Sequence, residues 1–307
     1  MVPESGAGAW LDLCCGSGVQ GLAAVAWGRC GHATCVDINP RAVHFTLCNA
    51  LLNGVPIHGD HPQLQAFLGD LYEPVDLSAT RKRRFDAVLA NPPFIAIPSS
   101  LTTELDKSLH LSWALFAAGG PAGNEVLRRI MEGAADHLEP GGWLGIVTEI
   151  PNVRATGTWL APLLGRHDGP IVGGHESGGA EETEGPGEGW VAAVLFGPND
   201  VVCAADYAAA RAAERGWRGG GEAVVSWERG MRESSVDNMT SALIYGCHCG
   251  DAVHKEADRG SSGGSRFDLR EYDGEEPDFM LGGGAEFVEA ALEATGRSVV
   301  SSGQPEQ

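Results

Sequence analysis

The chain has 307 residues, and 41 acidic against 21 basic side chains give it a net charge of −20, with 43% hydrophobic residues. This composition is typical of a water-soluble globular protein and excludes a chain that is disordered throughout. No stretch approaches the roughly 20 uncharged apolar residues that cross a bilayer, and the N-terminus lacks the basic and apolar segments of a secretion signal. We therefore expect no membrane association and a cytoplasmic location, with an organelle still open.

The cysteines predict thiols and no metal centre. The eight cysteines contain no CxxC pair and none of the spacings of a secreted disulfide framework, so we expect reduced and mostly buried side chains. Two groups of metal-binding residue types are too bunched or too loop-bound to predict a site. These groups are Cys247, His248 and Cys249 with His254, and His58 and Asp60 with His61.

The chain has one run of consecutive basic residues, Arg81–Lys82–Arg83–Arg84, and most of the acidic excess follows residue 100. A protein that binds nucleic acid unaided usually presents a basic face, because its affinity comes largely from neutralised phosphates. The run is interpreted as a solvated loop before a strand, with contact to RNA as the alternative.

From Trp10 to about Ile150, short apolar runs alternate with helical patterns, which predicts a parallel sheet wound with helices. The expected strands are 9–14, 33–36, 65–68, 85–90 and 143–147. A first helix starts at Val19, with Val19, Leu22, Ala23 and Ala26 on its buried face. A second helix has Asn39 as N-cap and Pro40 as first residue, and its buried stripe is Val43, Leu47, Ala50 and Leu51.

A third helix is expected at 125–138, with Leu127, Ile130, Met131, Ala134 and Leu138 in register and Pro140-Gly141-Gly142 closing it. After residue 150 the pattern is less regular. Strands are predicted at 190–196, 223–227 and 242–245, with helices at 204–215 and 285–294. The acidic, glycine-rich stretch 173–189 is expected to be a disordered insertion, and 251–284 to be mostly loop.

The segment Gly16-Ser17-Gly18-Val19-Gln20-Gly21 follows the first strand and opens a helix, so backbone amides there can approach a ligand that a Cβ would block. It matches G-x-G-x-x-G, and Asp37 lies 19 residues beyond Gly18, near the place of a ribose-binding acid in a dinucleotide fold. An NAD-dependent oxidoreductase is therefore one hypothesis. A simple tight turn built by the glycines is another.

Asn91-Pro92-Pro93-Phe94 ends the fourth predicted strand, where ligand-facing groups gather in doubly wound folds. The asparagine and the backbone carbonyl before the second proline offer two acceptors, and the aromatic ring offers a flat apolar wall. This set suits a planar substrate with an NH2 group, such as a carboxamide or a nucleobase amine. The alternative is a rigid turn without a ligand.

These motifs together resemble the class I S-adenosylmethionine-dependent methyltransferases, and within them the N-methyltransferases with an NPPY or NPPF motif. Four segments occur in the family's order, and 114–150 is similar to the equivalent part of the release-factor glutamine methyltransferases. The four segments are LDLCCGSGVQG at 11–21, VDINPRAV at 36–43, FLGDLYEPV at 67–75 and FDAVLANPPFI at 85–95.

The resemblance implies S-adenosylmethionine as cofactor and direct transfer of its methyl group to nitrogen. It implies that Asp12, Gly16 and Gly18 line the methionine end, that Asp37 holds the ribose, and that Asp70 and Leu71 contact the adenine. Asn91, which also borders the cofactor, and Pro92 would orient the target amide or amine, with Phe94 stacking on it. No metal is required.

The chain departs from the family at three places. Cys14 stands where many members have glycine, and Phe94 stands where glutamine and adenine enzymes usually have tyrosine; phenylalanine is more frequent in enzymes that modify ribosomal RNA. The chain also begins almost at the first strand. The usual N-terminal substrate-recognition region does not precede it, so we expect either a truncated sequence or a minimal catalytic domain, for which a partner subunit could supply substrate recognition.

Two smaller sets of residues have two readings each. Leu109, Trp113 and Phe116 follow the Asn-Pro-Pro-Phe motif and either line a substrate cleft or pack in a core. Glu149, at a strand end, either touches substrate or has a structural role.

The sequence as a whole predicts an α/β protein with a Rossmann-like, doubly wound, mainly parallel seven-stranded sheet, over residues 1–250, followed by a tail at 251–307 with a short helix. The predicted activity is methyl transfer to a protein glutamine or an RNA nucleobase. The acidic balance favours protein, while Phe94 and the basic run favour RNA. A catalytically silent partner subunit with the same fold is the alternative from another class.

Overall fold

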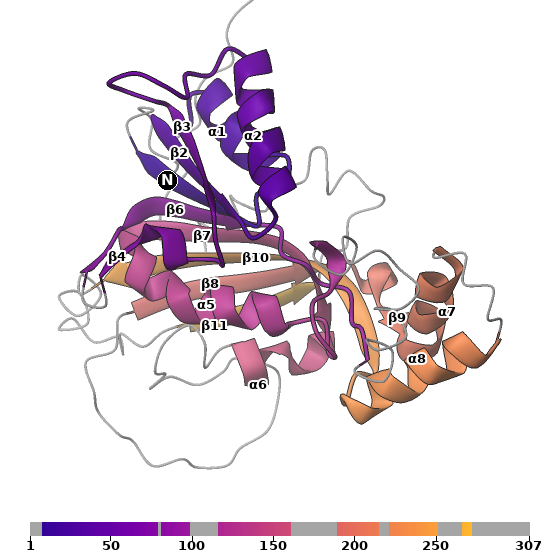
Figure 1. Cartoon of the computed structure of the whole chain (residues 1–307). Helices are drawn as coiled ribbons and strands as arrows, with labels where there is room; N and C mark the ends of the chain where they lie inside the picture. The colour runs from indigo at the N-terminus through magenta and orange to yellow at the C-terminus, as the bar shows by residue number, and fades with distance from the viewer. Residues whose placement is uncertain are drawn as a thin grey trace, which may run out of the picture.

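A computed structural model of the chain describes residues 8–78, 81–98, 116–160, 189–214, 221–250 and 266–271. Its first part alternates strand and helix as expected: β1 (Ala9–Leu13), α1 (Val19–Ala26), β2 (His32–Asp37), α2 (Pro40–Leu52) and β3 (Leu64–Leu68). Asn39 caps α2 by accepting the Arg41 N–H, and Pro40 is the first helical residue, both as predicted. The predicted Rossmann-like alternation is confirmed in this half of the chain (Figure 1).

The middle of the chain adds a small hairpin before the next long strand. After the short helix η1 (Glu73–Val75) come β4 (Asp76–Ser78) and β5 (Arg81–Lys82), then β6 (Phe85–Ala90), α5 (Glu125–His137) and β7 (Leu138–Pro151). The predicted stripe of α5 is confirmed, since Leu127, Ile130, Met131 and Ala134 are buried. Pro140-Gly141-Gly142 does not separate helix from strand. It lies inside β7, where the register with β6 shifts between Phe85 and Ala87.

The last part consists of η2 (Val153–Ala155), α6 (Thr156–Leu160), β8 (Gly189–Phe196), η4 (Pro198–Asp200), β9 (Val202–Cys203), α7 (Ala204–Glu214), α8 (Gly221–Glu233), β10 (Asn238–Gly250) and β11 (Arg266–Glu271). The predicted strands at 190–196 and 242–245 and the helix at 204–215 are confirmed. The predicted insertion at 173–189 and the helix at 285–294 lie outside the described residues, except for Gly189, which is the first residue of β8.

Two predictions for this part are wrong. Residues 223–227 were predicted as a strand and belong to helix α8. The prediction failed because a five-residue apolar run is equally compatible with a strand and with the buried face of a helix. Val224, Trp227 and Met231 recur there at helical spacing and pack together. Residues 266–271 were expected in a loop, and they form β11 in parallel pairing with β8. Strand β8 is far from β11 in the sequence, so no local pattern predicted this strand.

Nine of the described strands form one sheet in the order β11-β8-β10-β7-β6-β1-β2-β3, with β9 also pairing with β10, while β4 and β5 form a separate two-stranded sheet. The seven strands predicted are therefore too few. The five neighbouring strands β7, β6, β1, β2 and β3 are parallel to one another. Strand β10 runs antiparallel to β7, β8 and β9. The chain leaves β1 toward β2 on one side and returns to β6 on the other. This reversal makes the carboxyl ends of β1 and β6 the expected ligand position.

Side chains of β1 alternate between two cores on opposite faces of the sheet. Leu11 and Leu13 pack in a core with residues of α5, while Trp10 packs in a core with residues of α1 and α2. A third cluster joins α7 and α8 to the segment after β6, with Ile95 and Ile97 among its members. The segment that follows β6 is thus packed against helices from the C-terminal half of the chain.

The buried faces of the first two helices differ from the prediction. In α1 the buried residues are Gly21, Leu22, Ala24 and Val25, and in α2 they are Ala42, Thr46 and Ala50. Leu51, predicted to be buried, is 61% exposed. Small side chains are selected here because α2 lies against the glycine loop, where a Cβ on Gly18 would come within 2.6 Å of Thr46 Cγ2.

The described helices include none that is long and apolar enough to span a membrane.

Candidate active site

A cavity of about 450 Å³ opens at the carboxyl ends of the central strands. The segments after β1, β2, β3 and β6 all contribute to its lining, with Gly16, Asp37, Asp70, Leu71 and Asn91 among the residues. Cavities of roughly 300–1,000 Å³ are the usual size for small ligands and cofactors. The position is the one at which doubly wound sheets bind ligands. Five of the residues predicted from the sequence therefore meet in one place.

The loop after β1 carries a backbone that favours glycine. Gly16 and Gly18 have φ angles of 57° and 79°, and Gly18 is the N-cap of α1. Cys14, which replaces a glycine expected from the resemblance, also has a positive φ of 54° and lines the cavity. Gly16 lines the cavity too, whereas Gly18 is buried against Thr46 and is not among the lining residues. Gly18 thus brings the loop close to α2, and Gly16 faces the ligand position.

Asp37 ends β2 and connects two parts of the cavity wall. Its Oδ2 accepts the Gly16 N–H at 2.9 Å, and its Oδ1 accepts the Asn39 N–H at 2.8 Å. Both bonds are local links between the glycine loop and the N-terminus of α2. Because Asp37 also lines the cavity, its carboxylate lies where a ligand with hydroxyl groups could add further hydrogen bonds.

Asp12 lies beneath the glycine loop and is only 1% exposed. Its Oδ2 accepts the Gly21 N–H at 2.9 Å and its Oδ1 accepts from Gln20 Nε2 at 3.4 Å. Burial is the main reason why the pKa of Asp12 rises to about 7, and the nearby carboxylate of Asp37 raises it further while the Gly21 amide lowers it. Asp12 is not among the residues that line the cavity, because its carboxylate is turned toward the first turn of α1.

Asp70 and Leu71 follow β3 and lie opposite the glycine loop in the lining of the cavity. Asp70 Oδ2 pairs with Arg129 Nη2 at 2.8 Å, so that a helix on the other side of the sheet supplies the partner. Leu71 is buried and has a φ of 50°, a left-handed conformation that is unfavourable for a branched side chain. The turn that carries both residues is consequently held by its surroundings.

The segment after β6 divides between the cavity and the core. Asn91 and Pro93 line the cavity, while Pro92 is buried. Phe94 is half-buried, packs against the cluster under α7 and α8, and is not among the lining residues. Its stacking on a substrate stays a prediction. The aromatic ring that does line the cavity is Phe116, which is 58% exposed.

Several lining residues were not identified from the sequence as site residues. Apolar side chains on the wall include Val19 and Ile38, which are 65% and 50% exposed. Ile38 directly follows Asp37, so its position next to a predicted ligand group was an available signal. Arg129 and Val126 come from the start of α5, and nothing in their local pattern separates them from other helix residues.

Glu149 is taken up by contacts within the protein. Its Oε2 accepts from the Tyr207 hydroxyl at 3.0 Å, and its Oε1 pairs with Arg211 Nη2 at 2.5 Å. These bonds connect β7 to α7, which supports the structural reading of Glu149. Of the other candidates for a substrate cleft, Leu109 and Trp113 lie outside the described residues.

The basic run also makes contacts within the protein. Lys82 Nζ pairs with Asp76 Oδ2 at 2.8 Å, and Arg84 Nη1 donates to the Leu138 carbonyl at 2.6 Å. The guanidinium of Arg83 lies over the Phe85 ring, 5.1 Å from its centroid. Three members of the run are therefore already engaged, which leaves less positive charge for RNA phosphates than the sequence suggests.

The metal-binding residue types remain dispersed. His58, Asp60 and His61 are exposed, and Cys247 and His248 are buried in β10. Over the ranges that the structure describes, no group of three or more His, Cys, Asp or Glu side chains could hold a metal ion. Seven of the eight cysteines are free thiols, namely Cys14, Cys15, Cys30, Cys35, Cys48, Cys203 and Cys247.

The sequence is similar to known methyltransferases. A family model described as "Methyltransferase small domain" matches residues 1–109. A putative protein N5-glutamine methyltransferase of Methanocaldococcus jannaschii is 30% identical over 154 residues, covering 50% of this chain and 68% of the relative. The release factor glutamine methyltransferase of Chlamydia trachomatis is 31% identical over 141 residues, covering 45% of this chain and 43% of the relative.

The ribosomal protein uL3 glutamine methyltransferase of Bradyrhizobium diazoefficiens is 30% identical over 144 residues, covering 47% of this chain and 41% of the relative. The chain thus spans less than half the length of the release factor and uL3 enzymes that it matches.

Proposed function

Because the chain belongs to the S-adenosylmethionine-dependent methyltransferases, as a relative of the protein N5-glutamine methyltransferases, we propose that it methylates the side-chain amide of a protein glutamine. The cavity carries this proposal. It joins the glycine loop, Asp37, Asp70 and Asn91 at one edge of the sheet, in the order that a cofactor with a methionine end, a ribose and an adenine requires.

The lining of the cavity fits S-adenosylmethionine. The sulfonium is cationic, and the carboxylates of Asp37 and Asp70 both lie in the wall. Val19, Ile38 and Phe116 are large apolar side chains of the cavity wall that are at least half exposed, and a bound adenosyl group would cover them. We assign the ribose to Asp37, the adenine to Asp70 and Leu71, and the methionine end to Gly16. Asp12 and Gly18 would act on the cofactor by holding the glycine loop.

The proposed reaction needs positioning more than acid-base chemistry. S-adenosylmethionine supplies an electrophilic methyl group. As the nitrogen–carbon bond forms, the sulfur–carbon bond breaks, S-adenosylhomocysteine leaves and the amide nitrogen loses one proton to solvent. The Asn91 side-chain carbonyl and the Pro92 backbone carbonyl would accept the amide N–H groups and discourage delocalisation of the nitrogen lone pair. Correct alignment of this kind can contribute roughly 7–11 kcal/mol.

A protein acceptor is favoured over RNA by two observations. The net charge is −20, and Lys82, Arg83 and Arg84 of the basic run are occupied by contacts within the protein. The relatives named above modify glutamines in a release factor and in ribosomal protein uL3, so these two proteins are the first substrates to test. A reducing location such as the cytoplasm is part of the same proposal, since the described cysteines are free thiols.

The first test is calorimetric titration of the chain with S-adenosylmethionine and, separately, with NAD. Micromolar binding of the first and none of the second is expected; the reverse result would favour an oxidoreductase. Transfer of tritiated methyl groups to release factor and uL3 then tests the substrate. Asn91→Ala is the matched variant, because it should keep cofactor affinity within a few-fold and lose transfer. Loss of both to the same degree would refute the substrate-facing role of Asn91.

A further inference from the structure

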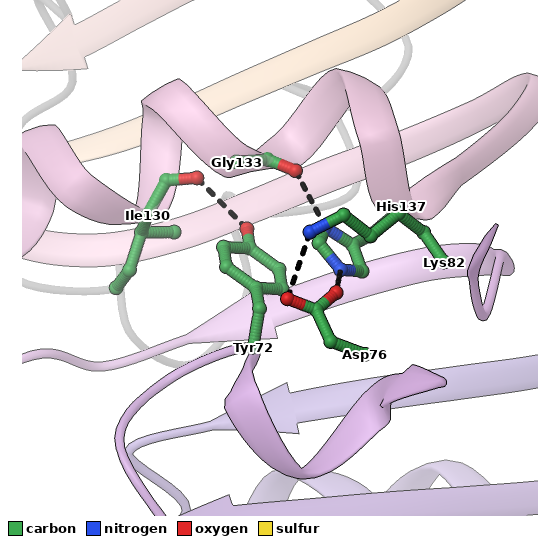
Figure 2. Close-up of polar contacts among 6 residues, drawn as sticks. All are labelled: Tyr72, Asp76, Lys82, Ile130, Gly133 and His137. Atoms are coloured by element: carbon green, nitrogen blue, oxygen red, sulfur yellow. Dashed lines mark hydrogen bonds and ion pairs between the residues drawn. The ribbon is translucent and has the colours of Figure 1, made fainter. Parts of the chain in front are cut away.

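Helix α5 contacts the segment that follows β3 at two places. One is at Arg129 and Ile130, and the other is at His137, the last residue of the helix. Arg129 Nη2 pairs with Asp70 Oδ2 at 2.8 Å near the start of the helix. One residue later, the Ile130 carbonyl accepts the Tyr72 hydroxyl at 2.8 Å. Figure 2 shows this second contact, in which the Tyr72 ring lies between the turn and the helix.

The third contact lies at the end of the helix. His137 Nε2 meets Asp76 Oδ1 at 2.9 Å, and His137 Nδ1 meets the Gly133 carbonyl at 2.7 Å (Figure 2). Both ring nitrogens face acceptors, so the imidazolium form is the one that donates on both sides. The rings of His137 and Tyr72 are stacked, with centroids 4.1 Å apart and planes at 14°.

The Tyr72 ring packs directly against the backbone of α5 at Gly133. A Cβ on Gly133 would come within 2.5 Å of Tyr72 Cε2, so only glycine lets the ring approach the helix this closely. Tyr72 is 7% exposed, and the residue before it, Leu71, holds its left-handed φ of 50°. A left-handed residue with a branched side chain costs of order 1 kcal/mol and persists where the surroundings impose it.

The turn between these contacts carries the two cavity residues assigned to the adenine. Asp70 and Leu71 lie directly before Tyr72, and both line the cavity. Within the described part of the chain, Arg129 binds the Asp70 side chain through Oδ2, which leaves Oδ1 for a ligand. A carboxylate fixed through one oxygen presents the other in a defined direction to an exocyclic amine.

We infer that Arg129 and Tyr72 are positioning residues for adenine: Arg129 orients the Asp70 carboxylate and Tyr72 holds Leu71 in its left-handed conformation against α5. This inference rests on the proposed function, because it assumes that the cavity binds an adenosyl group. The inference adds two residues to the proposed site, Arg129 on α5 and Tyr72 in the turn after β3. Neither was predicted from the sequence as a site residue.

The test uses binding of S-adenosylhomocysteine and of adenosine to the whole chain by calorimetry. Arg129→Met should weaken both by about twofold to fivefold, the effect of one partly exposed ion pair. Tyr72→Phe keeps the ring and removes the buried hydrogen bond, and should weaken both by about twofold to tenfold. In methyl transfer, the KM for S-adenosylmethionine should rise while kcat stays unchanged, since the adenine end is remote from the transferred methyl.

Matched controls are available for each variant. Arg128→Met changes the neighbouring arginine, whose guanidinium lies over the Trp159 ring outside the cavity. Tyr207→Phe removes another tyrosine hydroxyl bond, the one to Glu149 on β7. Both controls should bind as the wild type does. A double-mutant cycle adds a readout that loss of stability cannot mimic: in an Asp70→Ala background, Arg129→Met should have no further effect on binding.

The outcomes separate the two proposals. If the wild-type chain binds S-adenosylhomocysteine and Arg129→Met and Tyr72→Phe bind it equally well, the positioning inference is overturned and the proposed function stands. An Arg129→Met effect of full size in the Asp70→Ala background overturns the role of Arg129. If the wild-type chain binds neither ligand, the proposed function is wrong and the inference falls with it.

Discussion

At the scale of single residues, the carboxylate of Asp12 is the least favourably placed charge of the site. It is nearly fully buried, and burial raises its pKa to about 7. The folded state therefore binds a proton more tightly than the unfolded state, whose carboxyl titrates near 4. The contribution of Asp12 to stability must fall as the pH rises from about 4 to about 7.

Asp12→Asn should stabilise the protein at pH 8 by on the order of 1–3 kcal/mol and change little at pH 4 to 5. The neutral amide removes the buried charge, and the Gln20 side-chain amide can rotate to pair with it. Urea unfolding between pH 4 and 8 measures this. Asp86→Asn is the control, since Asp86 also accepts a backbone N–H, from Ala9, at 2.7 Å in the adjacent strand. If the difference in unfolding free energy between Asp12→Asn and the wild type did not change with pH across this range, the raised pKa of Asp12 would be refuted.

Asp37→Ala should weaken S-adenosylmethionine binding by roughly 1–3 kcal/mol, the usual cost of losing charge-assisted hydrogen bonds. The variant also loses the acceptors for the Gly16 and Asn39 amides. Asp37→Asn retains one acceptor oxygen, so its loss of affinity should be smaller. Calorimetry on both variants gives the comparison. Unchanged binding in Asp37→Ala would show that the ribose lies elsewhere.

At the scale of elements, the β4–β5 hairpin and the end of α5 meet at Asp76. Burial tends to raise the pKa of Asp76, but hydrogen bonds from Lys82 and His137 outweigh it and hold the pKa below its ordinary value. A carboxylate with a lowered folded pKa stabilises the fold above its unfolded pKa of about 4, and this contribution is lost as the pH falls through the folded pKa. The contact between hairpin and helix should consequently be sensitive to acid.

Asp76→Asn should lower the free energy of unfolding at pH 7 by roughly 1 kcal/mol, a modest figure because the side chain is partly exposed. The difference from the wild type should begin to shrink below about pH 4, where the carboxyl of the unfolded chain takes up a proton, and should be lost once the pH falls through the lowered pKa of the folded state. Urea titrations at pH 7 and at pH 3 to 4 test this. A difference that stays the same at both pH values would mean that the carboxylate charge is not what connects the hairpin to α5.

At the scale of the whole molecule, the C-terminal half of the chain holds the segment that carries Asn91. Trp227 of α8 is fully buried, and its Nε1 donates to the Ala96 carbonyl at 2.9 Å. On the other side of the segment, the Ile95 and Ile97 amides donate to the Ala117 and Gly120 carbonyls, each at 2.9 Å. The segment that begins with Asn91 is thus enclosed between two parts of the chain that are distant in sequence.

Trp227→Phe should lower the rate of methyl transfer several-fold and leave S-adenosylmethionine affinity nearly unchanged. It removes the hydrogen bond to Ala96, and misplacement of a substrate-orienting segment affects the reacting geometry more than the cofactor pocket. Hydrogen exchange at the Ile95 and Ile97 amides should become faster. Trp159→Phe, in α6, is the matched control and should change neither. A Trp227→Phe variant with normal exchange and normal transfer would remove α8 from the catalytic machinery.

Local chemistry was enough to predict the strands and helices of the N-terminal half and to single out Gly16, Asp37 and Asn91, whereas Asp70 and Leu71 came from the family resemblance. The strands around 9–14, 33–36 and 85–90 are bounded by glycine, asparagine or proline, and the predicted ligand residues stand at their carboxyl ends. In a parallel sheet those ends meet at one edge, so the motifs Gly16–Gly21, Asp37, Asp70 and Asn91 had to come together. These elements could be predicted because turn residues and strand periodicity depend on only a few neighbouring residues.

Contacts between distant segments were decided by the tertiary structure alone. The short run at 223–227 is helical because Trp227 finds its partner at Ala96, and 266–271 is a strand because β8 offers an unpaired edge. Arg129 lies in the cavity because α5 crosses the sheet next to Asp70. Phe94 packs away from the cavity because α7 and α8 supply an apolar cluster for it. Partners of this kind depend on how the layers pack, which no local pattern encodes.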